Sequence, residues 1–104
     1  MKHKDGGGKR HHKDLQLCRQ VFDALTYALA ELDDPVIDEL ALASVVPAPS
    51  SARVLVTLVP TRDDINLDVA LDHVREHADE LREEVAAEVT RKRTPVLVFR
   101  VGHC

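Results

Sequence analysis

Aromatic residues are scarce in this sequence of 104 residues, which contains one Tyr, two Phe and no Trp. The core must therefore be aliphatic, and Val, Leu and Ala dominate the hydrophobic 44% of the chain. No apolar run approaches the ~20 residues that a membrane-spanning helix needs, and no signal-type apolar segment follows the start. We therefore expect one compact domain that stays in the cytoplasm.

Cysteine is also rare, and the two residues present are far apart. Cys18 lies within a helical pattern, whereas Cys104 is the last residue of the sequence. In a cytosolic chain, two such cysteines are most simply two free thiols. A disulfide between them is the alternative, and it requires the C-terminus to fold back onto the first helix.

Motifs for catalysis or metal binding are missing. The sequence has no Ser/His/Asp set, no nucleophile elbow and no phosphate-binding loop. The acidic pairs Asp63-Asp64 and Glu83-Glu84 are typical of solvated loop and helix faces, not of the sheltered groups that general acid–base chemistry needs. The terminal His and Cys residues lack the spacing of a structural zinc site; they are His3, His11, His12, His103 and Cys104. We expect no enzymatic activity, no metal and no cofactor.

The charge is divided unevenly along the chain. Residues 1–13 carry five basic side chains and one acidic one, a net charge of +4, whereas residues 14–104 carry 9 basic and 17 acidic ones, a net charge of −8. Residues 1–13 also contain three consecutive glycines and no apolar periodicity, which predicts a flexible arm. A basic arm on an acidic body is typical of nucleic-acid contact.

Hydrophobic periodicity predicts an initial helix followed by two strands. From Asp14 to Leu32 the apolar residues recur at steps of three and four, and Asp34-Pro35 ends the helix. Residues 36–47 are predicted to form a strand with Leu40, Leu42 and Val45 on one face, which requires a bulge near Ser44. Residues 47–51 form the turn. The next strand spans residues 52–59, with Ala52, Val54, Val56 and Leu58 facing inward and Arg53 and Thr57 facing outward.

A long helical pattern and a final strand complete the chain. Asp64 or Asn66 is positioned to cap the helical segment, and an apolar stripe then runs from Leu67 to Val89. The cluster Arg91-Lys92-Arg93 falls at the C-terminal end of this helix, where cations complement the helix dipole. Pro95 stops the helix, and residues 96–101 form a strand with Leu97, Phe99 and Val101 inward. This order predicts an α+β fold, with helices on one face of a three-stranded sheet.

Several short motifs resemble ribosome-binding factor A, a small bacterial assembly factor. They are Asp34-Pro35 after the first helix, the strand Ala52-Arg53-Val54-Leu55-Val56, Leu81-Arg82, and Arg93-Thr94-Pro95-Val96-Leu97-Val98-Phe99. The resemblance covers roughly residues 14–101 and leaves residues 102–104 as a short C-terminal end. It implies a KH-like fold of type II, in which a kinked helix pair lies between the second and third strands.

The sequence departs from that family in three respects. The family marks its kink with an Ala-x-Gly sequence, whereas this chain has His77-Ala78-Asp79 at those positions. We still expect the bend near Ala78 and Asp79. In addition, the connection between the first two strands is about three residues shorter than usual, and the body is acidic where family members tend to be basic.

The resemblance implies a non-enzymatic factor that binds the immature small (30S) ribosomal subunit and its 16S ribosomal RNA and aids late maturation. Ribosomal proteins are further candidate partners, and we expect a monomer. The predicted RNA contacts are Lys9, Arg10, Lys13, Arg82, Arg91, Lys92 and Arg93. Each has a second interpretation: the arm is a solubilising tail, Arg82 pairs with a neighbouring carboxylate, and the cluster stabilises a helix end.

A different class of function is also open. A small α/β protein-interaction or dimerisation module would use an open sheet edge or the outward apolar residues Leu55 and Val59. The acidic body is compatible with that alternative.

Overall fold

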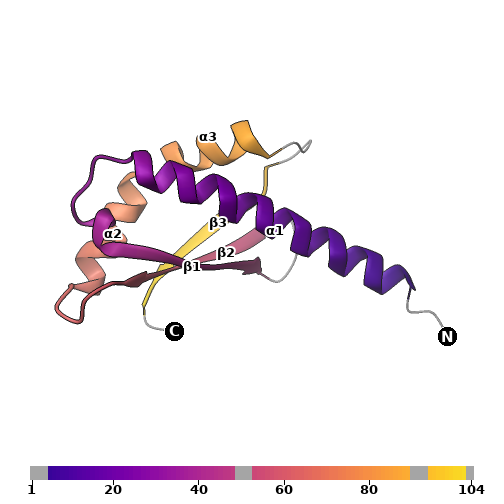
Figure 1. Ribbon diagram of the computed structural model, residues 1–104, viewed down its shortest axis with the longest axis horizontal. Helices are drawn as coiled ribbons and strands as arrows, with labels where there is room; N and C mark the ends of the chain where they lie inside the picture. The colour runs from indigo at the N-terminus through magenta and orange to yellow at the C-terminus, as the bar shows by residue number, and fades with distance from the viewer. Residues whose placement is uncertain (1–4, 49–52, 90–93, 103–104) are drawn as a thin grey trace.

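In the described part of the chain, three helices cover one face of a three-stranded sheet (Figure 1). The computed structural model describes residues 5–48, 53–89 and 94–102, and for residues 5–14 it describes the backbone alone. The elements in chain order are α1 (Asp5–Glu31), the 3-10 turn η1 (Ile37–Glu39), β1 (Leu40–Pro47), β2 (Arg53–Pro60), α2 (Leu67–Glu76), α3 (Ala78–Glu88) and β3 (Val96–Val101). The predicted α+β class and order of elements are confirmed.

The sheet has β2 at its centre. β1 pairs with it antiparallel, and β3 pairs with it parallel after the crossover through α2 and α3. Leu42 pairs with Leu58 and Ser44 with Thr57, so Ala43 is an extra residue in β1. This is the bulge predicted near Ser44, and it turns both Leu42 and Val45 toward the helices.

The core is aliphatic, as the composition predicts. Residues of α1 at steps of three and four are fully or almost fully buried. Alternate residues of β2 and the apolar residues on the inner side of α2 and α3 are buried as well. The largest side chains with less than 2% exposure are Leu17, Val21, Leu25, Val54, Val56, Leu58, Val74, Leu81 and Val85. Cys18 belongs to the same core, at 4% exposure, whereas Cys104 lies outside the described residues.

The first helix begins at Asp5, although the sequence predicts Asp14 as its start and an arm without structure over residues 1–13. The apolar stripe starts only at Leu15, and the first buried side chains among those described are Leu17 and Cys18. The earlier turns extend past the end of the sheet (Figure 1) and continue a helix that is already nucleated. Periodicity therefore marks where packing begins, not where the helix begins.

Two further expectations are corrected around the first two strands. Residues 36–39 form a turn and η1 rather than the start of a strand, because the Asp34 side chain accepts hydrogen bonds from the N–H groups of Val36 and Ile37. Thr57 lies on the outer face as predicted, but it is only 6% exposed. Its place on the central strand, between Ser44 and Arg100, accounts for its burial.

The helix pair is shorter than the stripe of apolar residues. α3 ends at Glu88, and Val89 already has extended backbone angles (φ −94°, ψ 118°) while its side chain stays buried. The predicted cluster Arg91-Lys92-Arg93 lies outside the described residues. Among the residues that the structure describes, no helix is long and apolar enough to cross a membrane.

Candidate functional site

The bend between α2 and α3 lies at His77, one residue before the predicted Ala78. His77 has φ −100° and ψ 5°, and its N–H donates to the carbonyl of Val74 at 3.1 Å. The N–H of Leu81 then donates to the carbonyl of His77 at 2.9 Å and starts the new helix. Because this backbone conformation is open to ordinary L-residues, the bend needs no glycine. The kinked helix pair of the predicted fold is present without the family's Ala-x-Gly sequence.

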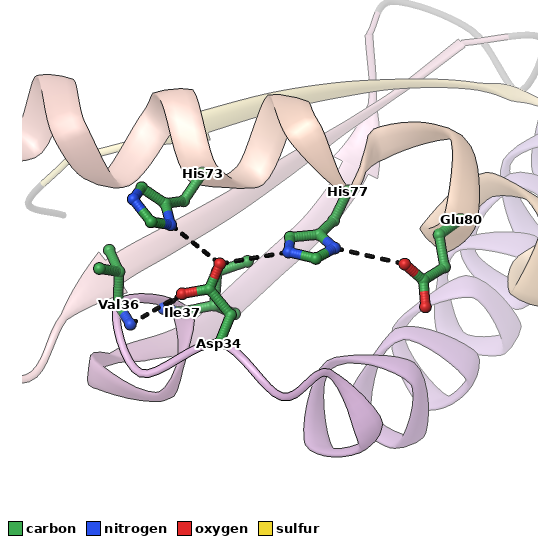
Figure 2. A network of polar contacts seen from close by, with 6 residues as sticks. All are labelled: Asp34, Val36, Ile37, His73, His77 and Glu80. Atoms are coloured by element: carbon green, nitrogen blue, oxygen red, sulfur yellow. Dashed lines mark hydrogen bonds and ion pairs between the residues drawn. The ribbon is translucent and has the colours of Figure 1, made fainter.

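A buried carboxylate holds this bend against the end of the first helix (Figure 2). Asp34 is 7% exposed, and its Oδ1 accepts from the N–H groups of Val36 at 2.9 Å and Ile37 at 3.3 Å. Its Oδ2 lies 2.9 Å from Nδ1 of His73 and 3.2 Å from Nε2 of His77. One side chain therefore fixes the turn before η1 and also ties that turn to α2 and to the bend.

The protonation states of Asp34 and His73 favour this contact. Burial raises the pKa of the Asp34 carboxyl, but hydrogen bonds from His73 and from the backbone N–H groups of Val36 and Ile37 outweigh it, and the pKa falls from 3.8 to about 2. The hydrogen bond to Asp34 raises the pKa of His73 above 6.5, against desolvation of the ring. The negative charges of Asp34, Glu76 and Asp72 also favour the protonated ring.

His77 faces a carboxylate on each side. Its Nε2 lies near Asp34, and its Nδ1 lies 3.3 Å from Oε1 of Glu80 (Figure 2). A neutral imidazole has one N–H donor, whereas the protonated ring has two, and ionised carboxylates only accept. The protonated form of His77 therefore satisfies both contacts, and the neutral form satisfies one.

Sequence reasoning finds only part of this cluster. The sequence pattern identifies Asp34 as a helix-ending residue and His77 as part of the kink, and it misses His73. His73 and His77 are four residues apart, which places both on one face of a helix. That spacing is the available signal, but only the tertiary fold shows that Asp34 lies opposite both rings. Among the described residues, no group of three His, Cys, Asp or Glu side chains is arranged to hold a metal ion.

Of the predicted RNA contacts, Arg82 is the one whose side chain is described. Its guanidinium donates to Oδ1 of Asp79 at 2.9 Å, three residues earlier on α3. A shallow groove beside Arg82 is also lined by Asp79 and Glu83. The predicted ion pair of Arg82 with a neighbouring carboxylate is confirmed, and its contact with RNA stays a prediction.

The other predicted contacts are basic residues of the first turns of α1 and of the segment that joins α3 to β3. The backbone of α1 carries Lys9, Arg10 and Lys13 in the turns that extend past the sheet, whereas the cluster Arg91-Lys92-Arg93 lies outside the described residues. In Figure 1, α1 begins at one end of the long axis, well past the sheet, whereas the end of α3 and the start of β3 lie near the middle of that axis. β2 begins beside the start of β3, where the exposed Arg53 pairs with Val96.

The opposite end of the molecule is acidic. There β1 begins, β2 ends and α2 begins, and Leu40 pairs with Pro60. The connecting segments, residues 35–39 and 61–69, contain five carboxylates and one arginine. Among the residues that the structure describes, the basic first turns of α1 and the acidic connecting segments therefore lie at opposite ends of the molecule (Figure 1).

Two solved structures match this arrangement of helices and strands closely. The crystal structure of ribosome-binding factor A from Thermus thermophilus has a TM-score of 0.70 and 23% sequence identity, and the match covers 83% of this chain and 92% of that chain. This chain has the fold of ribosome-binding factor A. A Thermotoga maritima protein, provisionally assigned as a ribosome-binding factor A and solved by NMR in solution, has a TM-score of 0.71 and 16% identity, with 84% of each chain covered.

At these identities the likeness to ribosome-binding factor A is one of fold. The sequence matches no protein-family profile and no curated protein. The fold supports the resemblance drawn from the short sequence motifs, and the contribution of individual cations to binding stays a prediction.

Proposed function

We propose that this protein is a ribosome-binding factor A that binds the immature small ribosomal subunit through its 16S ribosomal RNA and aids late maturation. The observation that carries the proposal is the match in fold, over more than four fifths of the chain, to ribosome-binding factor A from Thermus thermophilus. The proposed setting is the cytoplasm, and the proposed active form is a monomer.

The proposed mechanism is occupancy rather than catalysis. Favourable contacts with one conformation of the immature RNA increase the population of that conformation without any covalent step. A shape that is held rigidly suits this role, because the free energy of binding is then not spent on ordering the protein. The contact between Asp34 and the two histidines supplies such rigidity at the α2–α3 bend.

The proposed RNA-facing part runs from the end of the molecule at which α1 begins to the segment that joins α3 to β3. Lys9, Arg10, Lys13, Arg91, Lys92 and Arg93 are its proposed phosphate contacts, and their binding would release counterions and depend on salt. Arg82 has a smaller proposed role, because Asp79 already neutralises it. The acidic segments at the other end repel phosphate, so they favour one orientation of the protein on the RNA.

The test compares two triple variants of equal charge. The first variant replaces Arg91, Lys92 and Arg93 with Gln. The control variant replaces Arg19, Arg62 and Arg75 with Gln. Binding to purified small subunits is measured between about 50 and 300 mM salt. The first variant should bind more weakly and lose roughly two to three units of slope in log affinity against log salt, while the control keeps the wild-type slope. Equal slopes for all three proteins would count against the proposed cluster.

The outer face of the sheet favours a second candidate, a protein-interaction module. Val46, Leu55 and Val98 are neighbours across the three strands on the side that the helices leave open. Val46 is 43% and Val98 37% exposed, and Leu55 is half-buried. Light scattering distinguishes the two functions: a stable dimer with no affinity for ribosomal particles would favour the second.

A further inference from the structure

A groove separate from the α2–α3 bend lies between the turn that follows α1 and the start of α2. Its volume is about 390 Å³, and it is lined by Pro35, Val36, Glu39, Arg62, Ile65 and Val69, with Asn66 beside them. Four of these side chains are apolar, and Val69 is 45% exposed although it belongs to a helix. The floor of the groove is thus aliphatic and open to solvent.

The walls of this groove are fixed by hydrogen bonds. Thr61 donates to the carbonyl of Glu39 through its N–H at 2.9 Å and through its hydroxyl at 3.0 Å, which joins the two segments. The Asp34 carboxylate accepts a hydrogen bond from the N–H of Val36 and so fixes that side of the groove. Asn66 caps α2 by accepting from the N–H of Val69 at 3.0 Å. A ligand would therefore meet a preformed surface and would not have to order a loop.

The two chain segments that line the groove are acidic, and their carboxylates are called its rim below. Residues 35–39 and 61–69 carry five carboxylates and no lysine; the carboxylates belong to Asp38, Glu39, Asp63, Asp64 and Asp68. The single cation, Arg62, lies 3.4 Å from Glu39 and 3.4 Å from Asp64, so two of the five carboxylates already share its charge. The two segments therefore keep a net charge of −4. Of the five carboxylates, Glu39 lines the groove and Asp64 contacts the lining Arg62, whereas Asp38 lines a different groove beside α1.

We propose that this groove binds an extended, Lys- and Arg-rich segment of a protein partner, with one aliphatic side chain of that segment seated between Val36 and Val69. The basic side chains meet the acidic rim, which speeds association and fixes the orientation. The aliphatic side chain supplies specificity through its burial. RNA is a poor occupant because its phosphates meet the same carboxylates. This assignment does not depend on ribosome binding, since it rests on the groove alone.

The first experiment uses two labelled peptides and the full-length protein. The probes are fluorescein-labelled GKRKLKRKG and the matched GKRKSKRKG, which differ only in the central aliphatic or hydroxyl side chain. Fluorescence anisotropy at about 50 and 150 mM salt gives both affinities. The Leu peptide should bind about 5- to 20-fold more tightly than the Ser peptide, the lower part of the range for an aliphatic group in a hydrophobic pocket, because this groove is open to solvent. Both affinities should fall as salt rises.

Substitutions in the protein test the contributions of the aliphatic floor and of the acidic rim to peptide binding separately. Val69→Ser should bring the ratio of the two peptide affinities to about one, while the Ser peptide binds as before. Asp64→Asn with Asp68→Asn should weaken both peptides by a similar factor of several fold. The matched control, Glu83→Gln with Glu84→Gln on α3, removes the same charge away from the groove and should change both affinities by less than about twofold. All of these side chains are exposed, so the fold should tolerate each change.

Three outcomes would overturn the proposal. The first is equal affinity of wild-type protein for the Leu and Ser peptides. The second is an affinity loss in the α3 control as large as that in the rim variant, which would indicate general attraction to an acidic protein. The third is an amide chemical-shift map in which the Leu peptide moves α3 resonances and leaves Val36, Ile65 and Val69 unchanged. Shifts centred on those three residues support the assignment.

Discussion

Replacing Asp34 with Asn removes the charge at the α2–α3 bend and keeps most of the shape. The amide oxygen of Asn can still accept from the N–H groups of Val36 and Ile37, so the turn before η1 retains its cap. What disappears is the negative charge 2.9 Å from His73 and 3.2 Å from His77. The variant therefore isolates the ionic part of the contact that holds the bend.

The size of the effect follows from the pKa of Asp34. A fall from 3.8 to about 2 corresponds to about 2.4 kcal/mol of stability when the carboxyl is ionised. The Asp34 side chain is 9% exposed, but the two histidine side chains are 32% and 27% exposed, so solvent screens part of this interaction. The substituted amide also keeps the backbone hydrogen bonds. We expect Asp34→Asn to lower the free energy of unfolding by about 1–2 kcal/mol near pH 5.5.

The direction of the pH dependence is opposite for the two groups. The pKa of Asp34 is lowered on folding, so its stabilisation is complete above about pH 3.8 and is lost as the pH falls toward 2. The pKa of His73 is raised on folding, so its stabilisation is complete below about pH 6.5 and is lost as the pH rises through the raised value. Stability should therefore be greatest between about pH 4 and 6.5.

Urea unfolding at about pH 5.5 and 8.5 tests this account with two comparisons. Asp33→Asn is the matched control, because Asp33 is the exposed neighbour and its loss removes the same charge. His73→Gln should abolish most of the decline toward alkaline pH, and Asp34→Asn should do the same. The decisive quantity is the difference in the free energy of unfolding between the wild-type protein and His73→Gln. If that difference is the same at both pH values, the reasoning is refuted.

Three further predictions concern stability. Leu81→Ala, at a side chain with 0% exposure, should cost about 2–4 kcal/mol in urea unfolding; a cost below about 1 kcal/mol would mean that the bend repacks easily. Asn66→Ala removes the cap of α2 and should cost about 1 kcal/mol, whereas Asp64→Ala, the rival cap, should cost much less; equal costs would contradict the assignment. Arg82→Gln should change stability by less than about 0.5 kcal/mol, since its ion pair with Asp79 is exposed, and a larger loss measured by thermal melting would show a structural role.

The sequence is sufficient to predict most of the fold, because local signals and tertiary packing agree. Leu42 and Val45 require an extra residue between them, and the structure has it at Ala43. Asn66 is one of two candidate caps and is the one that accepts a hydrogen bond. In each case the chemistry of a short segment decides the outcome without reference to the rest of the chain.

The errors arise where the local pattern carries no signal or where distant residues decide the structure. The apolar stripe that begins at Leu15 places the start of α1 too late, because helix turns without a packing face leave no periodic signal. Residues 36–39 are predicted as strand, but the Asp34 carboxylate, fixed from across the fold by His73, caps a turn there. The contact between Asp34 and the histidines joins residues 39 and 43 positions apart, and no short-range pattern reveals such a pairing.

Sedimentation of the tagged protein from a cell extract tests the central proposal most directly. The extract is separated on a gradient at low salt, and the protein is followed alongside free small subunits, large subunits and mature ribosomes. A ribosome-binding factor A of the proposed kind should migrate with free small subunits and be absent from mature ribosomes. A protein that stays at the top of the gradient, or that migrates equally with every ribosomal particle, would contradict the proposal.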